Sequence, residues 1–256
     1  MKTYQHVLSR FGSDFGDREL DSITPDEVLS FLTQLTEGAK QSTKRTRYVG
    51  LASFFNFIKN TTNSKFQNPC DVPVLRKLFR CPASTQWTIL EKDVVDEIIF
   101  RTSKPRNRLM LELMARGGMR VSEVLNLTAA DVAGRKLILR QPKSGREAEV
   151  VFIPQKVADR LTEYIKAKEI SPSQRIFPIT YAAARAVVKK AGGLVGINLR
   201  SHDLRRHAAT YASRAGTPIE IVSKVILRHA NLSTTQRYLG KVSDAEAMRW
   251  IENLYG

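Results

Sequence analysis

Apolar residues recur along most of this chain with the spacing of amphipathic α-helices. In residues 24–38, Thr24 and Glu27 have the three-residue separation of a capping box, Pro25 lies between them, and Gly38 follows the apolar run. A capping box with proline at the first helical position begins a helix, and glycine commonly ends one. The segment therefore predicts a helix from residue 25 that ends before Gly38. Its expected apolar side consists of Val28, Leu29, Phe31, Leu32 and Leu35.

The same periodicity predicts that a second helix of about 18 residues follows. Its apolar side, which we expect in the core, carries Leu51, Phe54, Phe55 and Ile58. Three basic residues stand at its start, namely Lys44, Arg45 and Arg47. This basic end is either a solubility feature or a surface that contacts phosphate groups.

Residues 76–88 combine charge, a proline and small polar side chains, which is typical of a linker. The boundary predicted there divides the chain into an all-helical domain over residues 1–84 and a second domain over residues 85–256. Two apolar runs separated by PKSGRE, at 136–141 and 148–154, predict a β-hairpin in the second domain. Helices are predicted around it over 89–103, 105–118, 155–169, 180–193, 201–216, 218–227, near residue 238 and from residue 244. The expected fold class is mainly α with a small antiparallel β-sheet (α+β).

Composition narrows the class of protein. With 256 residues, of which 42% are hydrophobic and 26% charged, the chain can bury a substantial core. It has no apolar run of membrane-spanning length and its N-terminus lacks the apolar core of a signal peptide, so we expect a cytoplasmic protein without a membrane partner. Cys70 and Cys81 lack the spacing of a zinc site or a disulfide framework, and we expect reduced thiols.

The charge balance points to a polyanionic partner. The chain has 41 Lys and Arg against 25 Asp and Glu, a net charge of +16. Basic residues outnumber acidic ones by 12 to 8 in residues 1–84 and by 29 to 17 in residues 85–256, so both predicted domains are basic. Such an excess favours nucleic acid. Charge alone does not distinguish DNA from RNA or the ribosome.

Several short segments of the second domain supply candidate chemistry. The residues are Arg120, Lys143, His202, Arg205, His229 and Tyr238. Each has an ordinary structural explanation: a surface arginine, a lysine in a turn, a His/Arg pair on one face of a helix, a histidine after a helix end, and a half-buried tyrosine. We expect Ser201 to cap the helix that carries the His/Arg pair.

The ordered combination of these segments resembles the signature of tyrosine recombinases, the phage integrase family. GMRVSEVLNL, a hairpin lysine, HDLRRHAAT and LRHANLSTTQRY occur in that family's order, with Tyr238 nine residues after His229. The resemblance covers most of residues 88–256, and the helical N-terminal part is similar to the family's core-binding domain in character only. It indicates a minimal two-domain, Xer-like form with a core-binding domain over 1–84 and a catalytic domain over 85–256.

The resemblance implies a site-specific recombinase that cleaves and rejoins DNA through a covalent 3′-phosphotyrosine intermediate, in integration, excision or resolution. Tyr238 would be the nucleophile, His202 its general base, and Lys143 the general acid for the 5′ oxygen. The expected ligands of the scissile phosphate are Arg120, Arg205 and His229. We expect no cofactor and no metal ion, because two arginine forks already supply positive charge to the phosphate oxygens.

Two positions depart from the family pattern. Arg228 stands where a glycine usually precedes the last histidine. It either alters the local backbone or adds a phosphate contact, and we count it with the basic start of the second helix as a candidate DNA contact. Arg206 stands in place of the closing histidine of H-x-L-R-H, which leaves the His/Arg pair before it intact.

The resemblance also implies partners. These are double-stranded DNA with an inverted-repeat core site, a homotetramer on that DNA, accessory DNA-bending or directionality factors, and association with the nucleoid. The last helix has an apolar stripe that packs in cis or, as the family implies, on a neighbouring protomer. The stripe consists of Ala247, Trp250, Ile251 and Leu254.

Other classes of protein remain open. A non-catalytic DNA-binding regulator could be built on the same helices, and a type IB topoisomerase shares the cleavage chemistry but relaxes DNA without a specific site. A metal-dependent nuclease or transposase would lose activity in EDTA.

Overall fold

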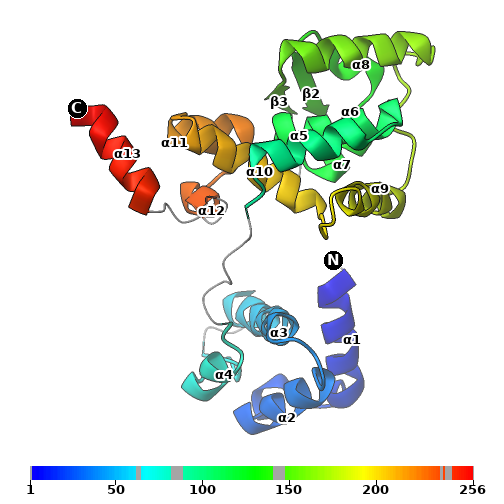
Figure 1. Ribbon diagram of the computed structural model, residues 1–256. Helices are drawn as coiled ribbons and strands as arrows, with labels where there is room; N and C mark the ends of the chain where they lie inside the picture. Colours follow the sequence, from blue (N-terminus) through cyan, green and yellow to red (C-terminus); the bar gives the residue numbers. More distant parts are fainter. Residues whose placement is uncertain are drawn as a thin grey trace. The chain divides into compact units, whose positions relative to one another are not determined.

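The computed structural model describes residues 2–61, 65–81, 89–140, 148–236, 239 and 244–255. It divides into two compact units, Met1–Thr85 and Gln86–Gly256, each with its own hydrophobic core. Helices dominate both units, and the second unit also contains a small antiparallel sheet (Figure 1). The predicted fold class, mainly α with a small antiparallel sheet, is confirmed.

The regular elements in the described residues of the first unit are all helical. Its elements are α1 (Lys2–Phe15), the 3₁₀ turn η1 (Leu20–Ser22), α2 (Pro25–Leu35), α3 (Gln41–Thr61) and α4 (Pro73–Leu78). At the start of α2 the hydroxyl of Thr24 accepts a hydrogen bond from the backbone N–H of Glu27 (3.3 Å), whose carboxylate accepts from the N–H of Thr24 (2.9 Å). The predicted capping box is therefore confirmed, and α1 and α2 pack against α3.

Aromatic rings form the centre of the first unit. The ring of Phe11 on α1 lies 5.5 Å from those of Phe31 on α2 and Phe55 on α3, in edge-to-face geometry. Leu51 and Phe55 are fully buried, whereas Phe54 and Ile58 pack against the core while partly exposed. The predicted apolar side of α3 thus faces the core. Residues at its centre are fully buried, and residues at its edges are partly exposed.

The predicted linker over residues 76–88 is wrong in its first part. Residues 76–78 belong to α4, and Phe79 is buried and stacks on Tyr48 at 5.3 Å between ring centroids. Leu75 and Phe79 lie four residues apart, which places both on one face of the helix and in the core. Because charged residues stand between Leu75 and Phe79, the sequence pattern did not indicate that the two form one apolar face. Residues 82–88 lie outside the described part of the chain.

The second unit is built around the buried helix α6 (Pro105–Arg116). Every residue from Leu109 to Ala115 is buried, because α5, α7, α8 and α10 all pack against this helix (Figure 1). The other elements are α5 (Lys92–Arg101), α7 (Val121–Asn126), η2 (Ala129–Asp131), α8 (Gln155–Ala167), α9 (Tyr181–Gly193), α10 (Ser201–Arg214), α11 (Ile219–Ile221), the π-helical turn η3 (Val222–Ile226), α12 (Leu232–Gln236) and α13 (Asp244–Tyr255).

The sheet has the order β1 (Val132–Ala133), β2 (Lys136–Arg140), β3 (Ala148–Phe152), with antiparallel pairing throughout. The two predicted strands are confirmed as β2 and β3, and the short β1 was not predicted. On the buried face Leu137 lies opposite Val151, and Leu139 lies opposite Glu149. An acidic side chain therefore occupies one place in an otherwise apolar buried row.

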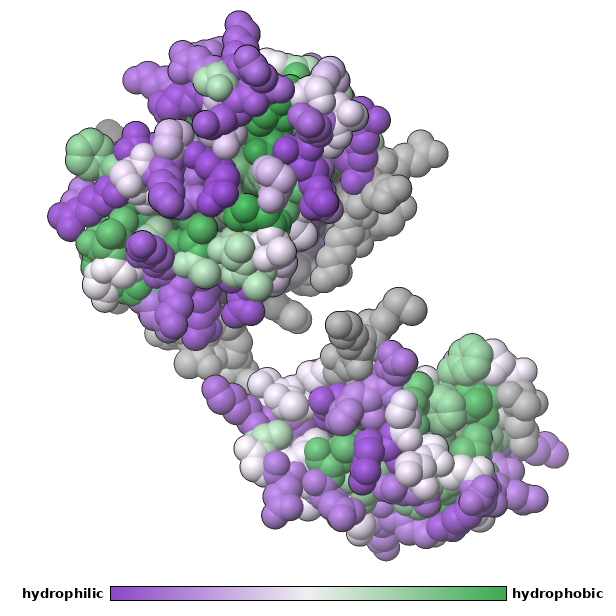
Figure 2. Space-filling view, turned by 90° about the vertical axis from the view of Figure 1, so that its right-hand side faces the viewer, coloured by the Kyte–Doolittle hydropathy of each residue, from purple (hydrophilic) through white to green (hydrophobic). Residues whose placement is uncertain are grey.

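The face of each unit seen in Figure 2 is mostly polar. Hydrophilic residues cover much of the face of each unit seen in Figure 2, with smaller hydrophobic areas between them. Among the described helices, none is both long enough and apolar enough to cross a membrane.

Replacing Phe55 with alanine is expected to lower the free energy of unfolding of the first unit by about 3 to 5 kcal/mol, because it leaves a cavity among buried rings. Urea unfolding followed by circular dichroism measures this loss. Phe57 lies in the same helix but is 62% exposed, so Phe57→Ala is the matched control and should change stability by no more than about 0.5 kcal/mol. Equal losses in the two variants would contradict this core.

Candidate active site

A glycine turn after α6 positions the first candidate residue. Gly118 has a positive φ of 60°, and a Cβ atom built on it would lie 2.8 Å from the backbone oxygen of Ile226 in η3. Real Cβ atoms do not approach a carbonyl oxygen this closely, so both the backbone angle and the packing require glycine. The turn places Arg120 at the N-cap of α7 and brings the backbone of Gly118 next to η3.

Arg120 is held by a carboxylate of its own helix. Its backbone N–H donates to Glu123 Oε2 (2.8 Å), and its guanidinium Nη1 donates to Oε1 (2.5 Å). The side chain of Arg120 stays partly exposed, whereas that of Glu123 is buried. A charge-assisted contact of this kind fixes the plane of the guanidinium and leaves one edge toward solvent.

Arg205 on α10 is among the largest fully buried side chains in the described part of the protein. Its guanidinium donates to the carbonyl oxygens of Gly118 and Leu227. These carbonyls belong to the glycine turn and to the end of η3, respectively. Arg205 thus connects the glycine turn to the end of η3. These two segments can approach each other because residue 118 is a glycine.

The start of α10 differs from the prediction. The N-cap is Arg200 rather than Ser201, because the carboxylate of Asp203 accepts a hydrogen bond from the backbone N–H of Arg200 (2.9 Å). Asp203 also pairs with Arg206 (3.1 Å), which is buried. The helix therefore begins at Ser201.

His202 lies one turn before Arg205, on the same face of α10, and remains accessible to solvent. Desolvation by the surrounding atoms lowers its pKa from the ordinary 6.5, and the positive charges of Arg205, Arg206 and Arg120 lower it further. The imidazole is therefore mostly neutral at pH 7, which is the state that a general base requires.

His229 follows η3 and is oriented by a short chain of hydroxyl groups. Its Nδ1 lies 3.0 Å from Thr235 Oγ1, which lies 2.8 Å from Ser223 Oγ, and both hydroxyl residues are buried. The backbone N–H of His229 donates to the carbonyl of Ser223 (2.9 Å). Desolvation, together with the charges of Arg205 and Arg120, lowers the pKa of His229 to about 4. The ring is neutral at physiological pH.

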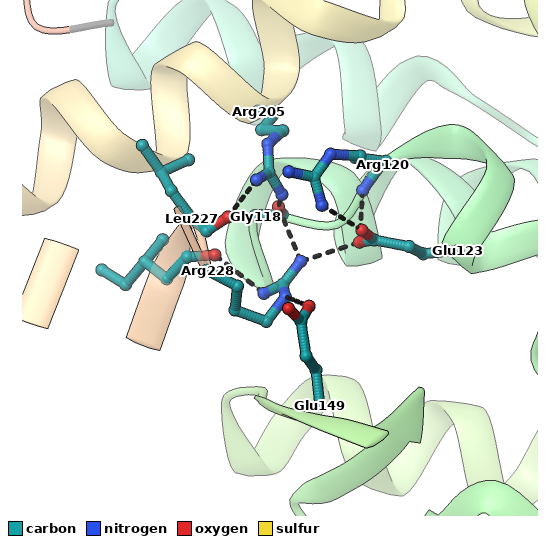
Figure 3. Close-up of polar contacts among 8 residues, drawn as sticks. Gly118, Arg120, Glu123, Glu149, Arg205, Leu227 and Arg228 are labelled. Carbon is teal, nitrogen blue, oxygen red and sulfur yellow. Dashed lines mark hydrogen bonds and ion pairs between the residues drawn. The ribbon is translucent and has the colours of Figure 1, made fainter. Parts of the chain in front are cut away.

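Arg228 points into the protein (Figure 3). Its guanidinium lies 2.7 Å from Glu123 Oε2 and 3.5 Å from Glu149 Oε2, and only 2% of the side chain is exposed. Its backbone has a positive φ of 51°. A direct contact with DNA, the second role considered for Arg228, would require the side chain to leave both carboxylates.

The structure brings several of the candidate residues together. Arg120 and Arg205 lie close to one another in Figure 3, and their charges act on the pKa of both His202 and His229. Lys143 and Tyr238 lie outside the described residues, so their places in the site stay predictions.

The candidate DNA contacts of the first unit lie at the start of α3. Arg45 is exposed, and Lys44 and Arg47 are partly exposed. In the described part of the chain, no three His, Cys, Asp or Glu side chains cluster as a metal site would require.

Sequence analysis missed the residues that support the candidate site. Glu123 stands inside the quoted GMRVSEVLNL segment and could have been found from its three-residue distance to Arg120. Thr235 stands inside LRHANLSTTQRY but looks like one of several small polar residues. Glu149 gives no local signal, because its partner lies far away in the sequence.

Comparison with known proteins identifies the family. The sequence model of the phage integrase family matches residues 88–244. The chain is 30% identical over 250 residues to the tyrosine recombinase XerA of Pyrococcus horikoshii, a match that covers 93% of this chain and 81% of the relative. It is 27% identical to a tyrosine recombinase of Thermosipho africanus, covering 99% of this chain and 92% of the relative.

Solved structures share the fold. The Tn1549 transposon integrase in complex with transposon right end DNA superimposes with a TM-score of 0.74 at 17% identity, covering 100% of this chain and 93% of that one. The XerH site-specific recombinase bound to a palindromic difH substrate gives a TM-score of 0.74 at 19% identity, covering 98% and 78%. Since the family model spans most of the chain and includes each of the candidate catalytic positions, the chain belongs to the phage integrase family of tyrosine recombinases.

Proposed function

We propose that this chain is a site-specific DNA recombinase that breaks and rejoins strands through a covalent 3′-phosphotyrosine at Tyr238. The observation that carries the proposal is that Arg120 and Arg205 lie close together and lower the pKa of two histidines, His202 and His229. All four residues belong to the region that matches the family. Relatives that match along most of the chain are tyrosine recombinases.

The two arginines are suited to a phosphate in its transition state. Attack on a phosphodiester builds negative charge on the nonbridging oxygens, and a guanidinium offers planar pairs of donors to such oxygens. Arg120 and Arg205 are already fixed by Glu123 and by backbone carbonyls before DNA binds. Donors fixed in advance stabilise the developing charge without reorganising during the reaction.

The covalent step follows from the remaining roles. The Oη of Tyr238 attacks the phosphorus while His202 takes its proton, and the bond from phosphorus to the 5′ oxygen breaks. Lys143 gives a proton to the departing 5′ oxygen. His229 donates to the phosphate through Nε2–H, in the tautomer whose Nδ1 accepts from the hydroxyl of Thr235. The phosphodiester becomes a phosphotyrosine ester, so a 5′ hydroxyl from another strand can reverse the step without ATP.

DNA binding involves both basic units. We assign backbone contacts in the first unit to the start of α3, where Lys44, Arg45 and Arg47 lie. The expected site is an inverted repeat with a short central spacer, because paired protomers of one chain present the same surface to each half. Strand exchange between two such sites uses a tetramer, together with accessory DNA-bending or directionality factors, on nucleoid DNA in the cytoplasm.

The last helix is proposed to contact a neighbouring protomer. In the single chain, the indole of Trp250 lies over Gly216, since a Cβ atom built on that glycine would be 3.1 Å from Trp250 Cη2. Met248 and Ile251 on the same helix remain 71% and 58% exposed. An apolar surface left open in the isolated chain is suited to packing against a second copy.

Covalent capture tests the proposed function. After selection of a binding site from random DNA, the native chain is expected to form a denaturation-resistant adduct with a nicked duplex of that site. Tyr238→Phe should bind the same duplex and form none, because it lacks the attacking oxygen. An adduct with Tyr238→Phe would overturn the assignment of the nucleophile. Binding without any adduct would identify a non-catalytic regulator, and relaxation of a plasmid without the site would indicate a type IB topoisomerase.

The pH profile tests the assignment of the general base. His202 must be neutral to accept the tyrosine proton, and its pKa is lowered below 6.5 by desolvation and by Arg205 and Arg206. The second-order rate constant of adduct formation, measured at subsaturating site DNA, reports the pKa of the free protein. Its acid limb, the fall in rate at low pH, should therefore lie below pH 6.5. His202→Asn should lose the limb. A limb centred at or above pH 6.5 in the native chain would count against His202.

Thr235 is expected to act as a positioning residue for His229. Thr235→Val removes the hydroxyl that holds Nδ1 and should lower the single-turnover rate about tenfold through misorientation, with unchanged affinity for the site. The neighbouring Thr234 is exposed, so Thr234→Val is the matched control and should cleave like the native chain. Equal rates in the two variants would show that the contact of Thr235 with His229 has no part in cleavage.

A further inference from the structure

Glu149 is an unusual residue for its place in the sheet. It lies on the buried face of β3, beside Val151 and opposite Leu139, where the alternation of the strand otherwise places apolar side chains. Neither of its carboxylate oxygens has a hydrogen-bond partner among the described residues. A buried charge without compensation costs several kcal/mol. Its ion-pair partner, Arg228, lies two residues after the end of η3 and supplies that compensation at 3.5 Å.

Arg228 is held in a conformation that arginine rarely adopts. Its φ of 51° lies in the left-handed region, which glycine enters freely and other residues enter at a cost. Such a conformation persists where the surroundings fix it. Here Nη1 donates to the carbonyl of Ile226 (2.8 Å), and Nη2 donates to Glu123 Oε2 (2.7 Å). The backbone thus keeps the geometry of the glycine that is usual at this position, while the side chain has entered the protein.

The acceptors of Arg228 also hold the two arginines of the site. Glu123 accepts from the guanidinium of Arg120 through Oε1 and from that of Arg228 through Oε2. The carbonyl of Gly118 accepts from Arg205 and lies 3.4 Å from Nη2 of Arg228. Figure 3 shows the three guanidinium groups around these shared acceptors. Although desolvation opposes ionisation of Glu123, the charge of Arg228 and the hydrogen bonds from Arg120 keep its pKa below the ordinary 4.5.

We propose that Arg228 is a positioning residue of the recombinase site, which joins Glu123 on α7 to Glu149 on β3. Through Glu123 it fixes the guanidinium of Arg120. Through Glu149 it fixes the strand that directly follows residues 141–147, the segment that carries Lys143. Arg228 touches neither DNA nor the reacting atoms in this role. The inference rests on the proposed function, because it assigns a part in the cleavage step.

Methionine is the most informative replacement, because Arg228→Met keeps an unbranched stem and the left-handed strain while removing the charge and its donors. It leaves Glu149 without a cation and Glu123 with one partner fewer. The single-turnover rate at saturating site DNA is expected to fall about 10- to 100-fold, with unchanged affinity for the site. The temperature of thermal unfolding is also expected to fall.

A double variant separates positioning from stability. Arg228→Met combined with Glu149→Gln removes the uncompensated buried charge, so it should regain most of the lost thermal stability. Its cleavage rate should stay low, because Glu123 still lacks its second guanidinium partner. If the rate recovered together with the stability, or if Arg228→Met cleaved as fast as the native chain, the proposal would be overturned. Should Arg228→Met fail to fold, the double variant supplies the same comparison with the native rate.

Arg160 provides a matched control. It pairs with Glu112 on α6 at 2.5 Å, and the side chain of that carboxylate is only 3% exposed. Arg160→Met therefore also strips a buried glutamate of its cation, and it should lose thermal stability while keeping the native cleavage rate below its unfolding temperature. If Arg160→Met lost rate as Arg228→Met does, the effect would be one of stability, which would overturn the proposal.

The native chain separates the two hypotheses. If it forms no adduct at all, the proposed function fails. The thermal comparison between Arg228→Met and the double variant then still decides whether Arg228 neutralises Glu149. If the native chain forms the adduct and the Arg228 variants form it at the same rate, the positioning role alone fails.

Discussion

The candidate site depends on keeping three guanidinium groups close together inside a protein. Like charges repel strongly where water is scarce, and a buried cation needs acceptors for its donors. The carboxylate of Glu123 and the carbonyls of Gly118 and Leu227 provide them. These acceptors belong to segments that are distant in sequence. The positive φ of Gly118 and its close approach to Ile226 allow those segments to meet. A side chain at position 118 would separate them.

The same concentration of positive charge acts on the histidines. Arg120 and Arg205 lower the pKa of both His202 and His229, because a second positive charge nearby is unfavourable. The arrangement that would bind a phosphate therefore also keeps both imidazoles unprotonated. The positive charge of Arg120 and Arg205 thus serves both to attract a phosphate and to keep the two histidines neutral.

Sequence patterns predicted what depends on local spacing. The capping box at Thr24, the strands β2 and β3, and most helices of the second unit follow from periodicity and end signals. The predictions were wrong where a contact with a residue distant in sequence determines the structure. Phe79 was assigned to a linker because its stacking partner, Tyr48, is distant in sequence.

The candidate site was predictable to a similar extent. The order of its motifs identified the family, but composition and spacing gave no sign that Arg228 would turn inward. That outcome depends on Glu149, a residue of another element whose burial only the paired sheet reveals. Replacing Arg228 with the glycine of the family pattern would therefore leave the carboxylate of Glu149 buried without its cation, unless Glu149 were exchanged as well.

The hydroxyl chain through Thr235 has a consequence for the timing of cleavage. Thr235 belongs to α12 and is buried between His229 and Ser223, and it precedes Tyr238 by three residues. A displacement of α12 that carried the proposed nucleophile, Tyr238, with it would also take away the hydroxyl that orients His229. The orientation of His229 and the position of the proposed nucleophile would then change together.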